Sequence, residues 1–437
     1  MMISPVAMSD LLSIPSFLLF HIVWLIHSIR RPLLLVSALC VLTDPLAAGR
    51  KLRLVGVSLA YLLLCKDKKW KVPPDVDPAS HFPAELGGSS KSESSSSSDG
   101  DDQGNEKYRE KTVILIRHGE STWNDTFNPG QRNKLLFVLF FVPNLAYAIF
   151  AELYYFVSGR DRDSWFYDSP LSVSGKDQIE GLRSFLKKEG LKVGGGAGGS
   201  SNSSGGGSGE ERAIRILLAL GEGKGTGGGD ELSSHVVSSN LRRAISTAVI
   251  GLADRFSRTT AGDDRDHEDK HDDRIVLLPS LQEISINPDA LSILPPRGVA
   301  CPTWCDEDIV GLPHGKFSSL VDTRYHSGNK ALNSNGLLRL EEFVSDVFDD
   351  DRLPRTNVVV VGHSLFFRSF FRVYMPRGAV HVAKEKKLVN GGAVMLTLRE
   401  VTVTAALSGG GKGKKAYMID PSSIVVVYGG FGKHTKG

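Results

Sequence analysis

Two scarcities narrow the function of this chain of 437 residues. Its four cysteines are too few for a fold that depends on disulfide bridges. Cys301 and Cys305 form an isolated pair, whereas a structural zinc site needs four ligands, so we expect no metal site. The rarity of cysteine also favours a reducing compartment for the folded part of the chain.

An excess of charge of one sign is also missing. The 52 Lys and Arg residues nearly balance the 49 Asp and Glu residues, which leaves a net charge of +3, and the basic residues are spread along the chain. A nucleic-acid-binding groove needs clustered basic residues. We therefore expect no nucleic acid among the partners.

Long apolar runs are plentiful at the N-terminus. Residues 11–29 contain no Asp, Glu, Lys or Arg and are long enough to cross a bilayer, whereas residues 33–43 and 54–65 are short for a span. A secretory signal peptide is disfavoured, since no basic segment precedes the first run and no clean cleavage site follows it. We predict that residues 1–71 form a hydrophobic membrane anchor with one span, and up to three. A cleaved organelle-targeting segment is the alternative.

The composition changes after the anchor region. Residues 85–106 are rich in Ser, Gly and acidic side chains, which bury too little apolar surface to fold, so residues 72–110 are predicted to be a disordered linker. Residues 111–430 are predicted to form one folded domain. Similar low-complexity runs interrupt that domain and are predicted to be surface loops, at 194–209, 221–230, 263–273 and 409–415.

Strand-like and helix-like segments alternate through this domain. Strands are expected at 112–116, 213–220, 235–239, 357–361 and 393–399, and helices at 174–189, 241–256, 338–349 and 365–374. This alternation predicts an α/β fold with a doubly wound, mostly parallel sheet flanked by helices. Ligands of such sheets bind beyond the carboxyl ends of the strands.

The segment Ile-Arg-His-Gly-Glu-Ser-Thr-Trp-Asn, residues 116–124, directly follows the first of these strands. Arg117 and His118 are therefore expected at the carboxyl edge of the sheet, where Gly119 allows a tight turn. An imidazole there can act as a nucleophile, and the guanidinium can bind a phosphate through two parallel hydrogen bonds. If the pair were isolated, a buried histidine beside a surface arginine would be the simpler interpretation.

Further motifs follow in order. They are residues 165–172 with Gly175 and Gln178, Ser-Asn-Leu-Arg-Arg-Ala at 239–244 with Thr247, Leu-Gln-Glu-Ile at 281–284, Val-Val-Val-Val-Gly-His-Ser at 358–364, and Leu-Val-Asn-Gly-Gly-Ala at 388–393. Together with the first motif, they resemble the histidine phosphatase superfamily, whose fold is phosphoglycerate-mutase-like. The resemblance extends from residue 112 to about residue 400 and includes none of the first hundred residues.

The resemblance implies specific roles for these residues. His118 would be the catalytic nucleophile, Glu283 the catalytic acid and base, and His363 a further catalytic residue. The phosphate-binding residues would be Arg117, Asn124, Arg243 and His363.

Several of these roles have alternatives. Arg243 is preferred to Arg242 because the family's arginine directly precedes Ala, although a solvated helix arginine is the other interpretation. His363 could instead be a core histidine. Residues 285–289 depart from the pattern expected around the acid, so Asp289 and Glu307 remain alternatives to Glu283.

The chemistry can also be considered without the family. Phosphoryl transfer depends mainly on positioning and charge neutralisation. The arginines supply the positive charge that a metal ion would otherwise bring, so no metal and no cofactor are expected. We predict a metal-independent, membrane-tethered phosphatase that hydrolyses a phosphate monoester through a phosphohistidine on His118. The alternatives are a phosphoglycerate-mutase-like phosphotransferase and a catalytically silent, membrane-tethered protein that binds a phosphorylated ligand.

An apolar insertion at residues 131–163 separates Asn124 from Trp165. Within it, residues 135–157 contain one charge, Glu152, and one proline, Pro143. A buried helix is one interpretation, but we predict an apolar helical hairpin beside the pocket that enters the membrane surface. The expected partners are thus the membrane, through the N-terminal segment and residues 135–157, and a phosphorylated small molecule, lipid or protein as substrate. The basic residues between 66 and 71 place the enzyme on the cytosolic side of that membrane.

Overall fold

The fold is that of a computed structural model, which describes residues 44–72, 77–82, 108–128, 133–160, 162–195, 208–219, 232–261, 273–298, 310–311, 314–403 and 414–432. The expected span at 11–29, the Ser-rich part of the predicted linker and Glu307 lie outside these residues.

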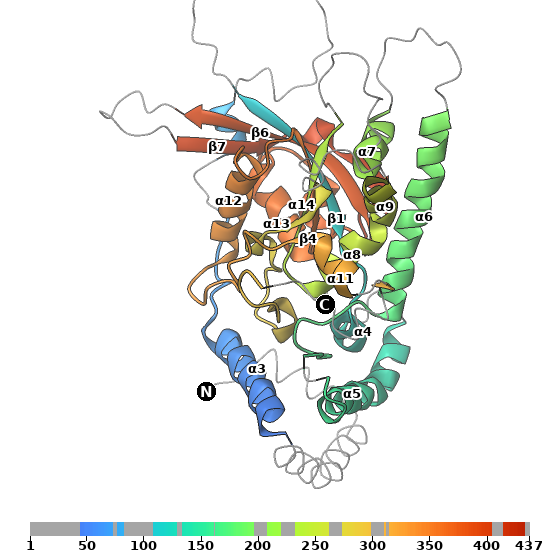
Figure 1. Ribbon diagram of the computed structural model, residues 1–437. Coiled ribbons are helices and arrows are strands. Elements are labelled where there is room, and N and C mark those ends of the chain that lie inside the picture. Colours follow the sequence, from blue (N-terminus) through green and yellow to red (C-terminus); the bar gives the residue numbers. More distant parts are fainter. Residues whose placement is uncertain are drawn as a thin grey trace, which may run out of the picture.

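Among the described residues, eight strands form one mixed sheet in the order β4-β3-β2-β5-β1-β6-β7, with β8 also paired to β6 (Figure 1). Neighbouring strands from β4 to β1 pair in parallel, whereas β6 pairs antiparallel with β1, β7 and β8. The strands are β1 (Arg109–Arg117), β2 (Ser234–Ser238), β3 (Ile275–Leu277), β4 (Val321–Asp322), β5 (Asn357–Gly362), β6 (Ala393–Val403), β7 (Lys414–Ile419) and β8 (Val425–Tyr428).

The central strands are apolar on both faces because helices cover both faces. In β1, Val113 and Leu115 belong to one hydrophobic core, whereas Ile114 and Ile116 belong to the other. This alternation is what a sheet buried between two helical layers requires. The α/β fold with a helix-flanked sheet is thus as predicted, although its sheet is mixed at one side.

One helical layer contains α6 (Val173–Gly195), α7 (Gly209–Leu218), α8 (Arg242–Gly251) and α9 (Ala253–Ala261), and the other contains α12 (Gly336–Val347) and α13 (Ser364–Tyr374). The shorter elements are α4 (Thr122–Phe127), α11 (His314–Ser319), α14 (Val382–Glu385), η1 (Pro78–His81), η5 (Pro279–Leu281), η6 (Pro288–Ala290) and η7 (Pro421–Ser423).

The strand expected at 213–220 is wrong, because residues 213–218 belong to α7. A short apolar run fits a buried helix as well as a strand. Here the Ser208 hydroxyl accepts the backbone N–H of Glu211 and caps a helix whose apolar side chains are buried. The helix expected at 241–256 exists but is divided at Leu252 into α8 and α9.

Two helices lie together at one end of the molecule (Figure 1). They are α3 (Pro45–Leu64), which begins at its cap Asp44, and α5 (Lys134–Val157). The side chain of Lys51 joins them through an ion pair of 2.6 Å with Glu152. Both helices expose large apolar side chains, so α5 is not a buried helix.

The predicted hairpin at 135–157 is wrong, because α5 is one helix that continues through Pro143. A proline removes one backbone hydrogen bond from a helix but does not always end it. Within the described parts of the chain, Leu135–Val157 is the one helix long and apolar enough to cross a membrane, with a mean hydropathy of 1.9.

Candidate active site

Two histidines leave the sheet at the same edge. Strands β1 and β5 pair in parallel with Arg117 opposite Gly362, so the next residues, His118 and His363, are neighbours. The backbone N–H of His118 donates to the carbonyl of Gly362 at 3.0 Å. The two imidazole rings are buried, and their centroids lie 4.9 Å apart at an angle of 60°.

The ring of His118 is held in one tautomer. Its Nδ1 lies 2.5 Å from the carbonyl oxygen of Gly119, and because a carbonyl only accepts, Nδ1 carries the hydrogen. The lone pair is therefore on Nε2. Burial lowers the pKa of His118 well below 6.5, and the charges of Arg243 and Arg117 lower it further. The imidazole is consequently neutral, with its free lone pair on Nε2.

His363 is also neutral. Burial lowers its pKa well below 6.5, and Arg243 and His118 lower it further. Its Nε2 lies 2.8 Å from the hydroxyl of Ser239, whereas its buried Nδ1 has no hydrogen-bond partner among the described residues. A cationic His363 would thus require an anion beside the ring, which would raise the pKa again.

Two guanidinium groups act on the histidines: Arg243 is buried, Arg117 is partly buried, and the charge of each lowers the pKa of His118. Arg243, in the first turn of α8, donates from Nη1 to the backbone carbonyl of Asp289 at 2.6 Å, and its Nη2 lies 3.4 Å from the Asp289 carboxylate. Arg117 donates from Nη1 to the carbonyl of Leu388 at 2.7 Å. Burial lowers the pKa of Arg117 to about 10, against the opposing charge of Glu283.

Each guanidinium keeps one nitrogen available for a ligand. The Nε atoms of Arg117 and Arg243 are buried and have no hydrogen-bond partner within the described ranges. A buried donor without a partner is costly, and a phosphoryl oxygen is the type of acceptor that would satisfy it.

Arg242 makes different contacts from those of Arg243. Arg243 is buried, so it is not the solvated helix arginine of the alternative interpretation, and Arg242 is buried as well. Its guanidinium donates to the carboxylate of Asp163 at 3.1 Å, to the carbonyl of Ser164 at 2.8 Å and to the carbonyl of Asp168. Arg242 therefore holds the segment that follows α5, while Arg243 faces the histidines.

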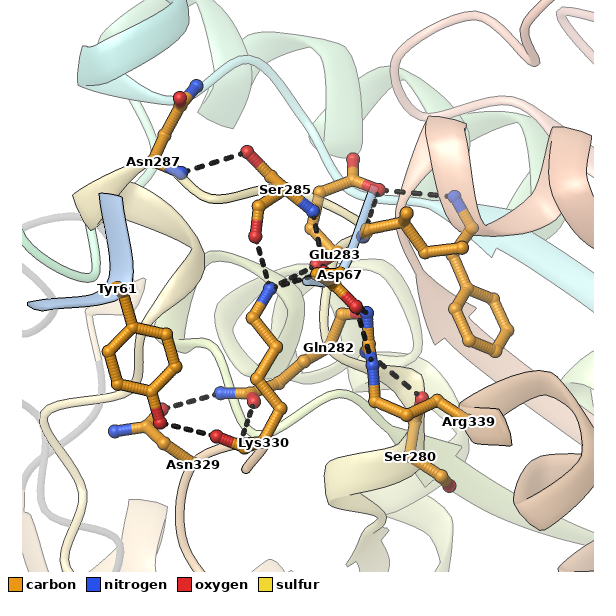
Figure 2. Close-up of polar contacts among 12 residues, drawn as sticks. Tyr61, Asp67, Ser280, Gln282, Glu283, Ser285, Asn287, Asn329, Lys330 and Arg339 are labelled. Carbon is orange, nitrogen blue, oxygen red and sulfur yellow. Dashed lines mark hydrogen bonds and ion pairs between the residues drawn. The ribbon is translucent and has the colours of Figure 1, made fainter. Parts of the chain in front are cut away.

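Glu283 lies beside the first turn of α13. Its Oε1 accepts the backbone N–H groups of Ile284 at 3.0 Å and Phe366 at 3.1 Å (Figure 2). Its charge opposes the lowering of the Arg117 pKa. The side chain is 8% exposed, so it borders the site without being sealed off.

The rivals of Glu283 are placed differently. The buried Asp289 pairs with Arg243, and burial raises the pKa of its carboxyl. Asp289 thus supports the arginine. Glu307 lies outside the described residues.

Asn124 lies on α4, after the turn. Its backbone N–H donates to the Ser121 hydroxyl at 3.3 Å, and its Oδ1 accepts from the Asn128 side chain at 2.6 Å. Neither contact joins Asn124 to the two histidines, so its predicted role as a phosphate ligand stays a prediction.

Sequence reasoning assigned no role to two supporting hydroxyls. Ser239 contacts His363, and Thr247 accepts the backbone N–H of Gly119 at 3.2 Å while donating to the carbonyl of Arg243 at 2.8 Å. Both residues lie within or just after the 239–244 motif, which was the available signal. Thr247 thereby ties the turn after β1 to the first turn of α8.

No site for a metal is evident: within the described ranges, no group of three or more His, Cys, Asp or Glu side chains could hold an ion. The charged groups that converge on the histidines are guanidiniums, which suit an oxyanion rather than a cation.

The fold and the side chains at the carboxyl edge of its sheet define a class of protein. It is an α/β protein with two neighbouring histidines at strand ends and arginines beside them. Comparison with known proteins finds no matching family model and no matching curated protein. Among solved structures, the chain is similar to a mycobacterial glucosyl-3-phosphoglycerate phosphatase complexed with VO3, at 14% identity and a TM-score of 0.27, over 66% of this chain and 93% of that one.

The α-ribazole phosphatase of Shigella flexneri is similar at 14% identity and a TM-score of 0.25, over 65% of this chain and 89% of that one. The matched structures are members of the histidine phosphatase superfamily, the family that the sequence motifs resemble. At these identities and TM-scores the likeness says nothing about activity.

Proposed function

We propose that this protein is a phosphatase that hydrolyses a phosphate monoester through a phosphohistidine on His118. The observation that carries the proposal is the pairing of two neutral, buried imidazoles, with centroids 4.9 Å apart, beside the unpartnered Nε atoms of Arg117 and Arg243. A tetrahedral phosphoryl group is an acceptor that would satisfy both guanidiniums at once.

In the first step, the lone pair on Nε2 of His118 attacks phosphorus, and the bond from phosphorus to the leaving oxygen breaks. Glu283, in its protonated form, gives its proton to that oxygen, so an alcohol departs. Arg117 and Arg243 stabilise the charge on the transferred group. His363 donates to a phosphoryl oxygen once the anion has raised its pKa.

In the second step, water attacks the phosphohistidine. Glu283, now ionised, takes a proton from the water, the bond between phosphorus and Nε2 breaks, and its electron pair returns to His118. Inorganic phosphate leaves, and both residues regain their initial protonation states. Neither step uses a metal ion, so chelation with EDTA is expected to leave the rate unchanged.

The test is phosphate release from 4-nitrophenyl phosphate by the full chain. His118→Ala is expected to lower kcat by at least about 10⁴-fold, because a nucleophile is lost. The matched control is His81→Ala, since His81 ends η1, which packs on β7 at the far side of the sheet. Protein labelled from the ester's phosphorus and quenched in alkaline denaturant should carry an acid-labile, alkali-stable phosphate on His118 only.

Other outcomes favour the alternatives. Turnover that survives His118→Ala contradicts the proposal. Phosphate binding without turnover of any ester in a panel of sugar, nucleotide, protein and lipid phosphates favours the silent binding protein. Return of the labelled phosphate to a sugar-acid acceptor favours the mutase-like phosphotransferase.

We also propose that the protein is membrane-bound, with the catalytic domain on the cytosolic side, through residues 1–71 and the apolar faces of α3 and α5. Helix α5 supports this proposal because its charged side chain faces the protein and its apolar side chains face outward. Its only charged side chain within Leu135–Val157, Glu152, points toward protein and accepts hydrogen bonds from Lys51, from the hydroxyl of Ser164 and from the backbone of Trp165.

The opposite face of α5 is apolar and exposed. The exposed side chains of α5 are Leu135, Leu136, Val138, Leu139, Phe140, Tyr147, Phe150, Tyr154 and Val157, and α3 adds Leu46, Leu52, Val55, Leu59, Leu62, Leu63 and Leu64. A helix that turns its charge inward and its leucines outward suits lipid rather than water.

Liposome flotation of a chain that begins at Asp44 tests this surface, because the first apolar runs are then absent. Leu139→Glu with Phe150→Glu is expected to release the protein from the vesicles, while Val380→Glu, at a loop position that is 97% exposed, leaves binding intact. Equal flotation of all three proteins would remove the proposal for α5.

A further inference from the structure

A carboxylate just after α3 is buried inside the catalytic domain. Asp67 accepts hydrogen bonds from Nη2 of Arg339 at 2.7 and 2.8 Å, from Nζ of Lys330 at 2.7 Å and from the backbone N–H of Ser285 at 2.9 Å (Figure 2). The three charged side chains are at most 3% exposed. This cluster, Asp67–Lys330–Arg339, is an ion-pair network within the core.

The two cations of the cluster hold the backbone that carries Glu283. Lys330 donates to the carbonyl of Glu283 at 2.7 Å and to the carbonyl of Ser285 at 2.5 Å. Arg339 donates to the carbonyl of Gln282 at 2.5 Å and to that of Glu283 at 3.3 Å. The carbonyls of residues 282, 283 and 285 are therefore all fixed by side chains that Asp67 neutralises.

Without Asp67, the two cations would be buried together with no counter-charge. Burial and the charge of Arg339 together lower the pKa of Lys330 to about 8, although Asp67 opposes both effects. Removal of one partner from a buried ion pair leaves an uncompensated charge, which either moves or loses its proton. In either case the hydrogen bonds to the carbonyls of residues 282, 283 and 285 change.

The chain around Asp67 is fixed as well. The backbone N–H of Gly336 donates to the carbonyl of Asp67 at 3.1 Å, and the hydroxyl of Tyr61 on α3 donates to the carbonyl of Lys330. Trp70 packs so closely on Gly336 that a Cβ there would lie 2.4 Å from its Nε1. Residues 61–70 thus form part of the catalytic domain, at the end of the helix that we assign to the membrane.

We infer that Asp67 is a positioning residue that fixes Glu283 for proton transfer to the leaving oxygen. The inference rests on the proposed function, and it makes the segment after α3 a required part of the site. Asp67 contacts no reacting atom. Its effect should therefore appear only where the proton from Glu283 matters.

The experiment compares two aryl phosphates with the full chain. The phenolate of phenyl phosphate needs a proton to leave, whereas that of 2,4-dinitrophenyl phosphate does not. Asp67→Asn is expected to lower kcat/KM for phenyl phosphate by at least about tenfold, because general acid catalysis contributes roughly 10²- to 10⁴-fold. For the dinitrophenyl ester the change should stay within about twofold. Inhibition by inorganic phosphate should be unchanged, which shows that the phosphate site remains folded.

Three further variants make the result decisive. Glu283→Gln should give the same dependence on the leaving group. Asp350→Asn removes a carboxylate that is 61% exposed and should alter neither ester. Asp67→Glu keeps the charge, and with it the fold, and should produce a smaller loss confined to phenyl phosphate. Asp67→Glu decides the question if Asp67→Asn does not fold.

A failure of this inference can be distinguished from a failure of the proposed function. If Glu283→Gln shows the selective loss and neither Asp67 variant does, Asp67 does not position the acid. If both esters fall equally in the Asp67 variants, Asp67 is merely structural and the inference is overturned. If Glu283→Gln itself affects both esters equally, the acid of the proposed function is wrong.

Discussion

The ring of His118 meets the ring of His363 edge to face at 4.9 Å, and the charge that a proton on His118 would bring lowers the pKa of its partner. Two imidazoles at this distance do not carry protons together without an anion between them. The two rings therefore suit an anionic ligand. The pH at which His118 takes up a proton should depend directly on burial and on the charges around the ring.

The first prediction concerns pH and stability. The folded-state pKa of His118 lies below its unfolded value of 6.5, so the unfolded chain binds more protons. Stability from this group is fully present above pH 6.5 and is lost as the pH falls below it, by up to about 1.4 kcal/mol per pH unit. Urea unfolding at pH 7 and pH 5 should show a smaller decline for His118→Asn than for the unchanged chain. An equal decline would contradict the lowered pKa.

The second prediction separates two adjacent arginines. Arg243→Lys is expected to lower kcat/KM by about 100-fold with little change in stability, because a lysine cannot offer the planar group of donors. Arg242→Lys should instead lower the free energy of unfolding by about 2 kcal/mol, since its hydrogen bonds to residues 163–168 are lost. Steady-state kinetics and urea unfolding of both proteins check this. If the two patterns are exchanged, the assignment of Arg243 is wrong.

The third prediction concerns the turn after β1. A Cβ on Gly119 would lie 2.5 Å from the carbonyl oxygen of Gly175, which is a backbone atom and cannot easily move aside. Gly119→Ala should therefore destabilise the protein by about 2 kcal/mol or more and displace His118. Gly378→Ala is the control, because a Cβ there meets nothing within 4 Å. Thermal unfolding compares the two, and similar melting temperatures would show that the turn is not tight.

The fourth prediction concerns where the folded domain begins. A chain that starts at Asp44 should unfold like the full chain, whereas one that starts at Tyr108 should lose about 3–5 kcal/mol, because Lys330 and Arg339 remain buried without Asp67. Adding Lys330→Met to the shorter chain should restore part of that loss. Full stability of the shorter chain in urea would show that the segment containing Asp67 is dispensable.

Much of the candidate site could be predicted from the sequence because it lies at strand ends. A run of buried apolar residues followed by Arg-His-Gly fixes the place of His118, and four valines followed by Gly-His fix that of His363. Parallel pairing of these strands then makes the two residues neighbours. The sequence favoured Arg243 over Arg242 because the arginine of the resembled family directly precedes Ala, and the structure places both as buried side chains with different partners.

Contacts between residues far apart in the sequence determined those elements of secondary structure that the local sequence pattern left open. The apolar run in α7 fits a strand or a helix, and burial against α6 and α9 rather than periodicity makes it a helix. Pro143 indicated a break, yet α5 continues through it. The predicted linker at 72–110 includes η1 and Phe82, which packs on Val401 and Met418.

The amino-acid sequence by itself determined strands β1, β2, β5 and β6 and the residues at their carboxyl ends, because these depend on apolar runs and on neighbours along the chain. Only the tertiary structure decided that Asp67 neutralises two cations beside the Glu283 loop and that Glu152 turns inward from an apolar helix. A buried charge is stable only beside its partner, and partners separated by more than a hundred residues leave no local signal in the sequence.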